Sequence, residues 1–424
     1  MHRLMKICHI NHTDNYTGGA RAAYRIHRAL LEQGVASYMQ VNQSSTGDWS
    51  VQLPDRSAIS KLFNKVRPLV AELPNLFFTS SFPAPHSASY IKSDWPSWIN
   101  SSGYEVVNLH WVYEMMSIED IARIRKPLVW TIHDMWAFCG AEHYTEDLRW
   151  QTGYLDGNRP DYESGFDLNQ WVWRRKAKAW KCPLHLVTPS RWLKRCVQES
   201  RLMETWPVTV IPNPIDTNFW KPVDRVMARS LYGIAPDVPL LLFGANGGGR
   251  IPNKGYDMLL SALGILRSEM PALELMVFGQ RAPENPEDLG FPVHYTGHLH
   301  DDLSLRLVYG AADAMVVPSR IEAFGQTASE AHACGTPVIA FDTTGLPDIV
   351  DHQETGYLAR RFETGDLARG VRWVLEEREN SLRLQRNARA KAVRTFDYQV
   401  VSSQYLEVYE RVLHEEHNRK YTVD

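Results

Sequence analysis

One βαβ unit in the second half of the chain constrains the fold more than any other stretch. Ala314–Val317 and Val338–Phe341 are short apolar runs of the kind that form buried parallel strands. Between them we expect a helix from about Gln326 to Cys334, with Gly335 as its left-handed C-terminal residue. A strand, a helix and a second strand in this order predict an α/β fold with a parallel sheet.

Two carboxylates flank the start of this helix. Glu322 lies in the loop before it and Glu330 about one turn inside it, so both face the crevice at the strand's carboxyl end, where open α/β sheets bind ligands. A carboxylate accepts hydrogen bonds from the paired hydroxyls of a ribose or hexose. Gly325 allows close backbone approach, and a helix start suits a phosphate. The pattern predicts a sugar-nucleotide pocket; the alternative is two solvated glutamates on an ordinary crossover helix.

The wider motif resembles a known family. E-x-F-G-x-x-x-x-E-A at 322–331 is followed by C-G-T-P-V-I-A at 334–340 and T-G-L-P-D-I-V at 344–350. This succession resembles the donor-site signature of retaining glycosyltransferases of family 4. The resemblance implies the glycosyltransferase-B fold, which is an α/β fold with two Rossmann-like doubly wound domains facing across a cleft.

The length of 424 residues also favours two domains, and 44% hydrophobic residues suffice for two cores. The resemblance implies an N-terminal acceptor domain over residues 1–211 and a C-terminal nucleotide-sugar donor domain over 212–395. We expect residues 396–424 to form a helix that crosses back to the first domain.

A glycine-rich loop follows the predicted strand Pro239–Gly244 and carries Arg250 and Lys254. An arginine fork and a lysine point charge suit a diphosphate. Such cations stabilise the charge that develops on a leaving phosphate without a metal, and a matching pair does so in the resembled family. The alternative is a nicotinamide-binding loop, but its G-x-G-x-x-G spacing is absent here.

The N-terminal half offers weaker signals. Lys6–Ile10 predicts a strand, and Gly18 and Gly19 open a helix to about Gln33, for which tight packing is an alternative explanation. By resemblance, the backbone N–H of Gly19 faces the donor. His133, at the end of a predicted strand, contacts the donor sugar by the same resemblance. His110 has a similar position and is left open as a further cleft residue.

The resemblance therefore implies a complete set of donor-site residues. Glu322 holds the sugar hydroxyls, Glu330 the ribose, and Arg250 and Lys254 the diphosphate, while His133 lines the sugar site. The remaining donor-binding residues by resemblance are Gly19, Phe324, Gly325 and Gln326. No side chain is expected to act as a covalent nucleophile, because in this family the leaving phosphate is thought to take the acceptor proton in a front-face displacement.

Composition excludes several other classes. A net charge of −3 argues against nucleic-acid binding. The five cysteines form no C-x-x-C pair, so neither a disulfide framework nor a metal site is indicated, and we expect no cofactor. The N-terminus turns polar too soon for a signal peptide and no apolar run reaches eighteen residues, so we expect a cytoplasmic protein.

Two basic segments leave alternatives open. Residues 59–70 have apolar positions at helical spacing, with Lys61, Lys65 and Arg67 on the other side, as in helices that lie on anionic membranes. Residues 171–181, WVWRRKAKAWK, combine basic and aromatic side chains that suit an anionic acceptor or the inner face of a membrane. For both, core packing with a solvated basic face is the alternative.

We therefore expect a retaining glycosyltransferase that moves a sugar from a nucleotide-sugar donor to a glycan or lipid-linked acceptor, as in the synthesis of bacterial surface polysaccharides. The acceptor class comes from the resemblance alone. Two rival functions are a sugar-nucleotide epimerase of the same fold and a non-catalytic protein that binds nucleotide sugars.

Overall fold

The computed structural model describes residues 5–15, 17–54, 66–244, 251–284, 288–299, 301–376 and 378–421. The chain divides into two compact units, and each is described by itself. Unit 1 consists of residues 1–214 and 401–424, and unit 2 consists of residues 215–400. The boundaries expected from the sequence lay at 211/212 and 395/396, within five residues of those in the structure.

Unit 1 is built on a seven-stranded parallel sheet in the order β3-β2-β1-β5-β6-β8-β9. The strands are β1 (Lys6–Thr13), β2 (Ala36–Gln43), β3 (Val51–Gln52), β5 (Val106–Leu109), β6 (Leu128–Thr131), β8 (His185–Thr188) and β9 (Val208–Val210). Strand β1 runs three residues beyond the predicted Ile10, because Asn11 and Thr13 still pair with β2. A separate antiparallel ribbon joins β4 (Phe78–Ser80) to β7 (Glu163–Gly165).

The helices of unit 1 connect these strands. They are α1 (Gly18–Glu32), α3 (Trp95–Ser101), α4 (Ile118–Ile121), α5 (Arg149–Thr152), α6 (Leu168–Ala179), α7 (Arg191–Glu199) and the 3₁₀ turn η1 (Leu73–Phe77). Helix α1 begins at Gly18 as predicted, with Thr17 accepting a hydrogen bond from the Ala20 N–H.

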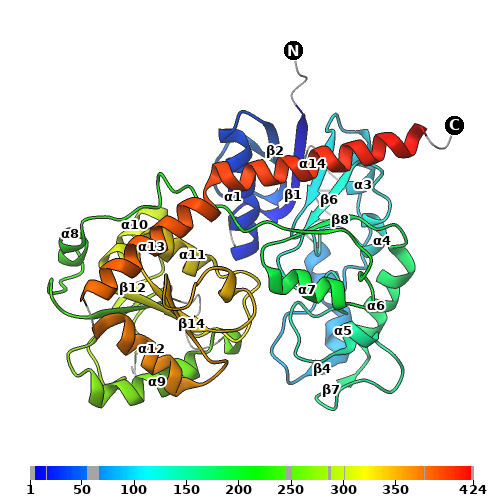
Figure 1. The fold of residues 1–424 in the computed structure, drawn as a ribbon. Helices are drawn as coiled ribbons and strands as arrows, with labels where there is room; N and C mark the ends of the chain where they lie inside the picture. Colours follow the sequence, from blue (N-terminus) through cyan, green and yellow to red (C-terminus); the bar gives the residue numbers. More distant parts are fainter. Residues whose placement is uncertain are drawn as a thin grey trace. The chain divides into compact units, whose positions relative to one another are not determined.

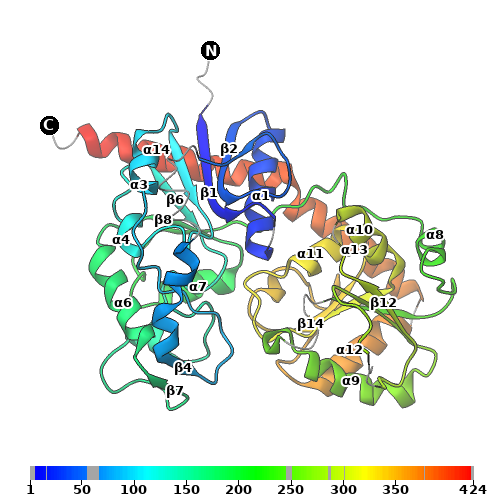
Figure 2. The ribbon, with the colours of Figure 1, turned by 180° about the vertical axis from the view of Figure 1, so that it is seen from behind.

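The last helix, α14 (Tyr398–Tyr421), completes the core of unit 1 (Figures 1 and 2). Its side chains Val401, Tyr405, Val408, Tyr409 and Val412 lie in one buried cluster with residues of α1 and four strands. The Tyr409 hydroxyl also accepts a 2.7 Å hydrogen bond from Asn108 Nδ2 at the centre of the sheet. Burial of this amphipathic face is the main reason that a helix so distant in sequence belongs to this unit.

Unit 2 contains a six-stranded parallel sheet in the order β12-β11-β10-β13-β14-β15. The strands are β10 (Leu240–Gly244), β11 (Glu274–Phe278), β12 (Val293–Gly297), β13 (Ala314–Val317), β14 (Val338–Phe341) and β15 (Gly356–Ala359). The order reverses between β10 and β13, and such reversal points are where doubly wound sheets bind ligands. With both sheets wound in this way, the prediction of two doubly wound α/β domains is confirmed.

Helices cover both faces of this second sheet (Figure 1). One face packs on α9 (Tyr256–Glu269) and α12 (Thr364–Glu376). The other packs on α8 (Arg225–Ser230), α10 (Asp302–Ala311), α11 (Gln326–Ala333) and the end of α13 (Arg378–Phe396). Two 3₁₀ turns, η3 (Pro252–Lys254) and η4 (Leu346–Asp348), lie in the loops of this unit.

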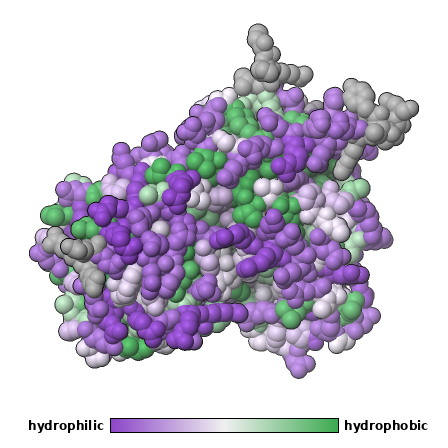
Figure 3. All heavy atoms as spheres, in the orientation of Figure 1, coloured by the Kyte–Doolittle hydropathy of each residue, from purple (hydrophilic) through white to green (hydrophobic). Residues whose placement is uncertain are grey.

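In the part of the chain that the structure describes, no helix is both long enough and apolar enough to cross a bilayer. On the face that Figure 3 shows, hydrophilic residues predominate and the hydrophobic atoms lie in separate groups.

Candidate functional site

In unit 2, Lys254 and Glu322 meet at the point where the sheet order reverses. Lys254 Nζ forms an ion pair with Glu322 Oε1, and the two side chains are 35% and 16% exposed. Ser319 Oγ donates a 3.0 Å hydrogen bond to the same carboxylate oxygen. The structure therefore brings together a cation and a carboxylate that the sequence had placed 68 residues apart.

Backbone contacts fix Lys254 beside the loop that carries Glu322. Gly255 has a φ of 67°, and a Cβ there would lie 1.9 Å from the Pro318 carbonyl oxygen, so only glycine permits this approach. The Arg320 N–H donates to the Asn253 carbonyl at 2.8 Å, and its guanidinium bonds Asp257. These contacts hold η3 against the end of β13.

The Glu322 backbone is fixed from the other side by the T-G-L-P segment. The Glu322 N–H donates to Thr344 Oγ1 at 3.0 Å, and the Gly345 N–H donates to the Glu322 carbonyl at 2.9 Å. A Cβ on Gly345 would lie 2.8 Å from that carbonyl oxygen. The motif residues beyond the two glutamates thus set the position of Glu322.

Helix α11 begins at Gln326 as predicted. Gly325 precedes it with a φ of 105°, and Gly335 follows its C-cap Cys334 with a φ of 77°, so both glycines adopt the left-handed backbone that favours this residue. Phe324 is buried and packs edge-on against Phe396. The positive end of the α11 dipole lies at this start, which suits an anion.

Glu330 differs from Glu322 in its surroundings. It is 3% exposed, and its Oε2 accepts a 2.8 Å hydrogen bond from the Tyr309 hydroxyl of α10. This contact ties α11 to α10. A ribose contact of Glu330 stays a prediction. The predicted diphosphate ligand Arg250 lies outside the described residues.

In unit 1, His133 and Gly19 lie against one another as the two predicted donor-site residues of this half. A Cβ on Gly19 would lie 3.4 Å from His133 Cβ and 3.6 Å from its Cγ. The N-terminus of α1 therefore packs on the imidazole, and its partial positive charge disfavours a protonated ring. Burial lowers the pKa of His133 to about 4, so the side chain is neutral at pH 7.

His133 is the outer end of a chain of three buried histidines. His110 Nδ1 lies 3.1 Å from His133 Nε2, and His110 Nε2 lies 2.9 Å from His9 Nδ1. Successive rings are stacked, with centroids 5.4 and 5.2 Å apart. The chain crosses three neighbouring strands, because His9 lies on β1 while His110 and His133 follow β5 and β6. Sequence reasoning missed His9, although a histidine near the end of each of three adjacent strands was the available signal.

Asp134 organises the loop that follows His133. Its carboxylate accepts hydrogen bonds of 2.9, 2.7 and 2.7 Å from Trp111 Nε1, the Tyr113 hydroxyl and His143 Nδ1. Burial would raise the pKa of Asp134, but these contacts outweigh it and hold the pKa below its usual range. The backbone beside His133 is thus well fixed.

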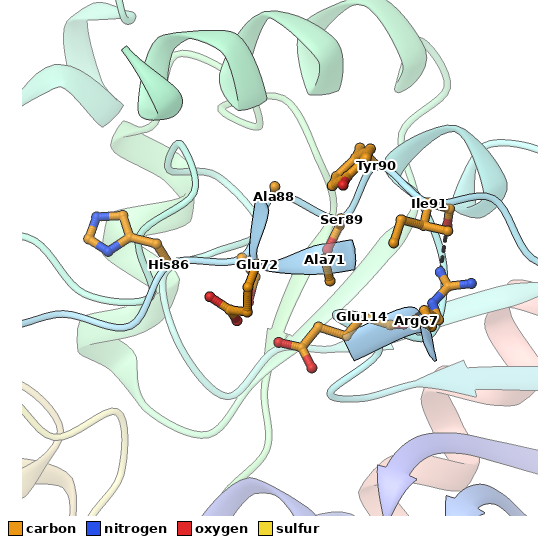
Figure 4. Close-up of a pocket in the computed structure, with 10 residues that line it drawn as sticks. Arg67, Ala71, Glu72, His86, Ala88, Ser89, Tyr90, Ile91 and Glu114 are labelled. Atoms are coloured by element: carbon orange, nitrogen blue, oxygen red, sulfur yellow. Dashed lines mark hydrogen bonds between the residues drawn. The ribbon is translucent and has the colours of Figure 1, made fainter. Parts of the chain in front are cut away.

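Unit 1 also contains a small pocket, shown in Figure 4. It is lined by Arg67, Ala71, Glu72, residues 86–91 and Glu114. The carboxylates of Glu72 and Glu114 point in the same direction in this view. Burial and the charge of Glu72 raise the pKa of Glu114. The pocket therefore combines two close carboxylates.

The basic segments predicted as surface features are partly internal. Lys61 and Lys65 lie outside the described residues, but Arg67 is 5% exposed and donates to the backbone carbonyls of Ile91, Lys92 and Glu114. The prediction of an exposed basic face that includes Arg67 is wrong. The physical reason is that a guanidinium can be buried when carbonyl oxygens satisfy its N–H groups.

In residues 171–181, most of which form α6, Arg174, Lys178 and Lys181 are exposed as a solvated basic face requires, but the same correction applies to Arg175 and Lys176. Lys176 is fully buried, and its Nζ donates to the carbonyls of Trp136, Cys139 and Gly140 while lying 3.6 Å from the Trp136 ring centroid. Arg175 forms a two-pronged contact with Glu119. These two cations hold the interior of unit 1 together and are not offered to a ligand.

Metal ligands are not grouped in the described ranges: no set of three or more histidine, cysteine, aspartate or glutamate side chains there has the geometry to hold an ion. The predicted metal independence stays a prediction.

Two protein-family models match the chain. One, described as Glycosyltransferase Family 4, matches residues 16–219. The other, described as Glycosyl transferases group 1, matches residues 248–391. The two matches cover parts of both units and include His133, Lys254, Glu322 and Glu330.

Curated relatives match over part of their length. The D-inositol 3-phosphate glycosyltransferase of Nocardia farcinica is 35% identical over 228 residues, which are 50% of this chain and 49% of the relative. The enzyme of the same name from Segniliparus rotundus is 36% identical over 36% of this chain and 35% of its own. The chain thus spans about half or less of the length of these relatives.

Solved structures match over nearly the whole chain. Sucrose-phosphate synthase from Thermosynechococcus elongatus has a TM-score of 0.68 at 17% identity, covering 97% of this chain and all of the other. The Anabaena protein HepE, solved with UDP-glucose, has a TM-score of 0.64 at 18% identity, covering 96% of this chain and all of its own. At such identities the likeness establishes the fold.

Proposed function

Because this chain belongs to the family 4 type of glycosyltransferases and has their glycosyltransferase-B fold, we propose that it transfers a sugar from a nucleotide-sugar donor to an acceptor hydroxyl with retention of configuration. The observation that carries the proposal is the Lys254–Glu322 pair at the reversal point of the unit 2 sheet. A donor that carries a diphosphate and a hexose presents an anion to the lysine and hydroxyls to the carboxylate.

The proposed chemistry assigns each group a task. The acceptor oxygen bonds to the anomeric carbon on the face from which the diphosphate leaves. The bond between that carbon and the phosphate oxygen breaks, and the departing phosphate takes the acceptor proton. Lys254 and Arg250 stabilise the charge on this phosphate, while Glu322 holds the sugar hydroxyls. No metal is required in this scheme.

The pocket of unit 1 bears on the acceptor class. Glu72 and Glu114 accept hydrogen bonds from hydroxyls but repel a phosphate, and the Arg67 guanidinium beside them already bonds three carbonyls. The free space in this pocket is about that of one water molecule, so it takes at most one acceptor hydroxyl, and its carboxylates favour a neutral glycan or lipid-linked sugar over a phosphate. The second candidate is a phosphorylated inositol, which the names of the curated relatives favour.

The donor is identified first by its effect on thermal stability. A panel of nucleotide sugars is mixed with the protein, and the donor raises the melting temperature by mass action. That donor is then incubated with neutral glycans and with D-inositol 3-phosphate, and the anomeric configuration of the product is read by NMR. A product with the donor's configuration supports the proposal.

The rival functions give different results in the same experiment. Conversion of the donor into its epimer without any acceptor indicates a sugar-nucleotide epimerase. A donor that binds but is neither transferred nor converted indicates a non-catalytic binding protein. An inverted product would contradict retention while leaving glycosyl transfer intact.

A further inference from the structure

The hydrogen bonds of the histidine chain restrict where its protons lie. Each neutral imidazole has one N–H and one bare nitrogen, and burial lowers the pKa values of His9 and His110 well below the usual range. His110 uses both ring nitrogens, so it donates to one neighbour and accepts from the other. The chain therefore has only two states, with all its protons pointing outward to His133 or all pointing inward to His9.

The inner end of the chain distinguishes these two states. His9 Nε2 is buried and has no hydrogen-bond partner. In the inward state this nitrogen carries a buried, unpaired N–H, whereas in the outward state it is a bare nitrogen. Orphaned buried N–H groups are rarer in proteins than under-satisfied acceptors. The outward state is therefore favoured, in which His110 Nδ1–H donates to His133 Nε2.

This direction determines the hydrogen that His133 presents. With Nε2 accepting from His110, the single proton of the neutral His133 ring lies on Nδ1. Among the described residues Nδ1 has no hydrogen-bond partner, and it is not among the buried unpaired atoms, so it is the accessible end of the chain. His133 can then donate a hydrogen bond from Nδ1 but cannot accept a proton there.

We propose that His110 is a positioning residue that fixes His133 as the Nδ1–H tautomer, so that His133 offers a neutral hydrogen-bond donor to an oxygen of the donor substrate. The proposal rests on the proposed function for its substrate and not for the tautomer itself. It also explains how a histidine can lie at the site without acting as the base, since the leaving phosphate takes the acceptor proton in the proposed reaction.

The tautomer is measured directly on the full-length protein without substrate. The sixteen histidines are labelled with ¹⁵N, and two-bond proton–nitrogen correlations separate pyrrole-type from pyridine-type nitrogens. The signals of His133 are identified by their loss in His133→Gln. We expect a pyrrole-type Nδ1 and a pyridine-type Nε2. The opposite assignment overturns the proposal, and His133→Asn serves to identify the signals if His133→Gln fails to fold.

His110→Phe then tests the positioning role, because a phenyl ring can stack between His9 and His133 but cannot donate. We expect His133 to become a mixture of tautomers, and kcat to fall about tenfold, which corresponds to one hydrogen bond lost in the transition state. An unchanged tautomer in a folded His110→Phe protein contradicts the proposal.

His27→Phe is the matched control. His27 is a buried histidine of the same unit whose two nitrogens bond Ser37 and Ser50, outside the chain. The His27→Phe change should leave the His133 tautomer unchanged. If the tautomer changes as much in His27→Phe as in His110→Phe, then a general loss of packing explains the effect of His110→Phe, and the proposal is contradicted. If no donor is turned over by the wild-type protein, the proposed function fails while the tautomer result still stands or falls independently.

Discussion

Units 1 and 2 are both built on a doubly wound parallel sheet, but they carry different side chains near the ends of their strands. In unit 1 the strand ends carry a chain of buried neutral histidines. In unit 2 they carry an ion pair that is partly exposed to solvent. A buried imidazole is held in one position but stays neutral, because burial disfavours its charged form. A partly exposed ion pair keeps its charges, although solvent and salt screen them. For the proposed reaction, we expect unit 1 to supply orientation and unit 2 to supply electrostatic stabilisation.

The two units are expected to differ most in how far their free energies of unfolding fall at acidic pH. Burial lowers the pKa values of seven described histidines in unit 1, to about 4 for His27, His86 and His133, well below the usual range for His9 and His110, and also for His12 and His185. In unit 2, by contrast, His332 is the one described histidine with a lowered pKa, of about 3. The unfolded chain then binds protons first as the pH falls below about 6.5, so the free energy of unfolding of unit 1 falls between pH 6.5 and 4. Each group contributes up to about 1.4 kcal/mol per pH unit.

Urea unfolding at pH 7 and pH 5 measures this effect. Twelve of the fourteen tryptophans lie in unit 1, so their fluorescence reports mainly on that unit. We expect the fluorescence midpoint to fall more than the midpoint by circular dichroism, which reports on both units. Burial raises the pKa of Glu142 to about 7, and its protonation stabilises unit 1 on acidification, which reduces the loss. Equal shifts of the fluorescence and circular-dichroism midpoints would mean that acid destabilises both units alike, which contradicts the expected difference between them.

The second largest effect is expected from removal of the charge in unit 2. Lys254→Met should lower kcat by about 10²- to 10³-fold, the range found when one preorganised donor to a developing negative charge is removed. Transfer rates at saturating donor measure this loss. Lys391→Met is the control, since it removes a lysine that pairs with Asp351 in the same unit. That variant should lose thermal stability rather than rate, and a similar fall in kcat for both would leave Lys254 without a special role.

The two glutamates of unit 2 sharpen the comparison further. If Glu330 holds the ribose, Glu330→Ala should weaken the nucleoside diphosphate by about 1.5–3 kcal/mol, while Glu322→Ala should leave that affinity nearly unchanged and lower transfer. Calorimetry with the diphosphate and rate assays with the donor separate the two effects. Tyr309→Phe provides the control, because it removes one hydrogen bond to the Glu330 carboxylate and leaves the carboxylate in place. Diphosphate binding lost equally in Tyr309→Phe and Glu330→Ala would mean that the carboxylate supports the fold alone.

The smallest effect is expected from a chelator. With Lys254 and Arg250 on the diphosphate, transfer should continue at an unchanged rate in excess EDTA. Activity abolished by EDTA and restored by magnesium or manganese would refute this expectation, and would shift the electrostatic role from the side chains of unit 2 to an ion.

Sequence patterns predicted the backbone well where glycine and apolar runs decide it. Helix α11 begins at the predicted Gln326 and ends at Ala333, one residue before the predicted Cys334, because Gly325 and Gly335 adopt conformations that other residues avoid. The side chains of Arg67 and Lys176 were misjudged for the opposite reason. Their burial depends on clusters of backbone carbonyls formed by distant segments, and such clusters leave no pattern in the sequence.

The candidate site was predictable in parts for the same reason. Glu322, Glu330 and Lys254 belong to local motifs, so the sequence singled them out. The histidine chain depends on the neighbouring positions of β1, β5 and β6, which are far apart in sequence. His9 lies within β1 while His110 and His133 follow their strands, and only the strand order makes them a chain.

Helix α14 has a consequence for the order in which the protein is made. Unit 1 takes its residues from both ends of the chain, and unit 2 is synthesised between them. Tyr405 and Tyr409 are fully enclosed in the core of unit 1, so the nascent unit 1 has an open apolar face until α14 has been synthesised. Unit 2 can complete its own core first, although it emerges from the ribosome second. A helix that is synthesised after unit 2 thus closes unit 1, and the apolar face exposed before that moment is a surface that chaperones would recognise.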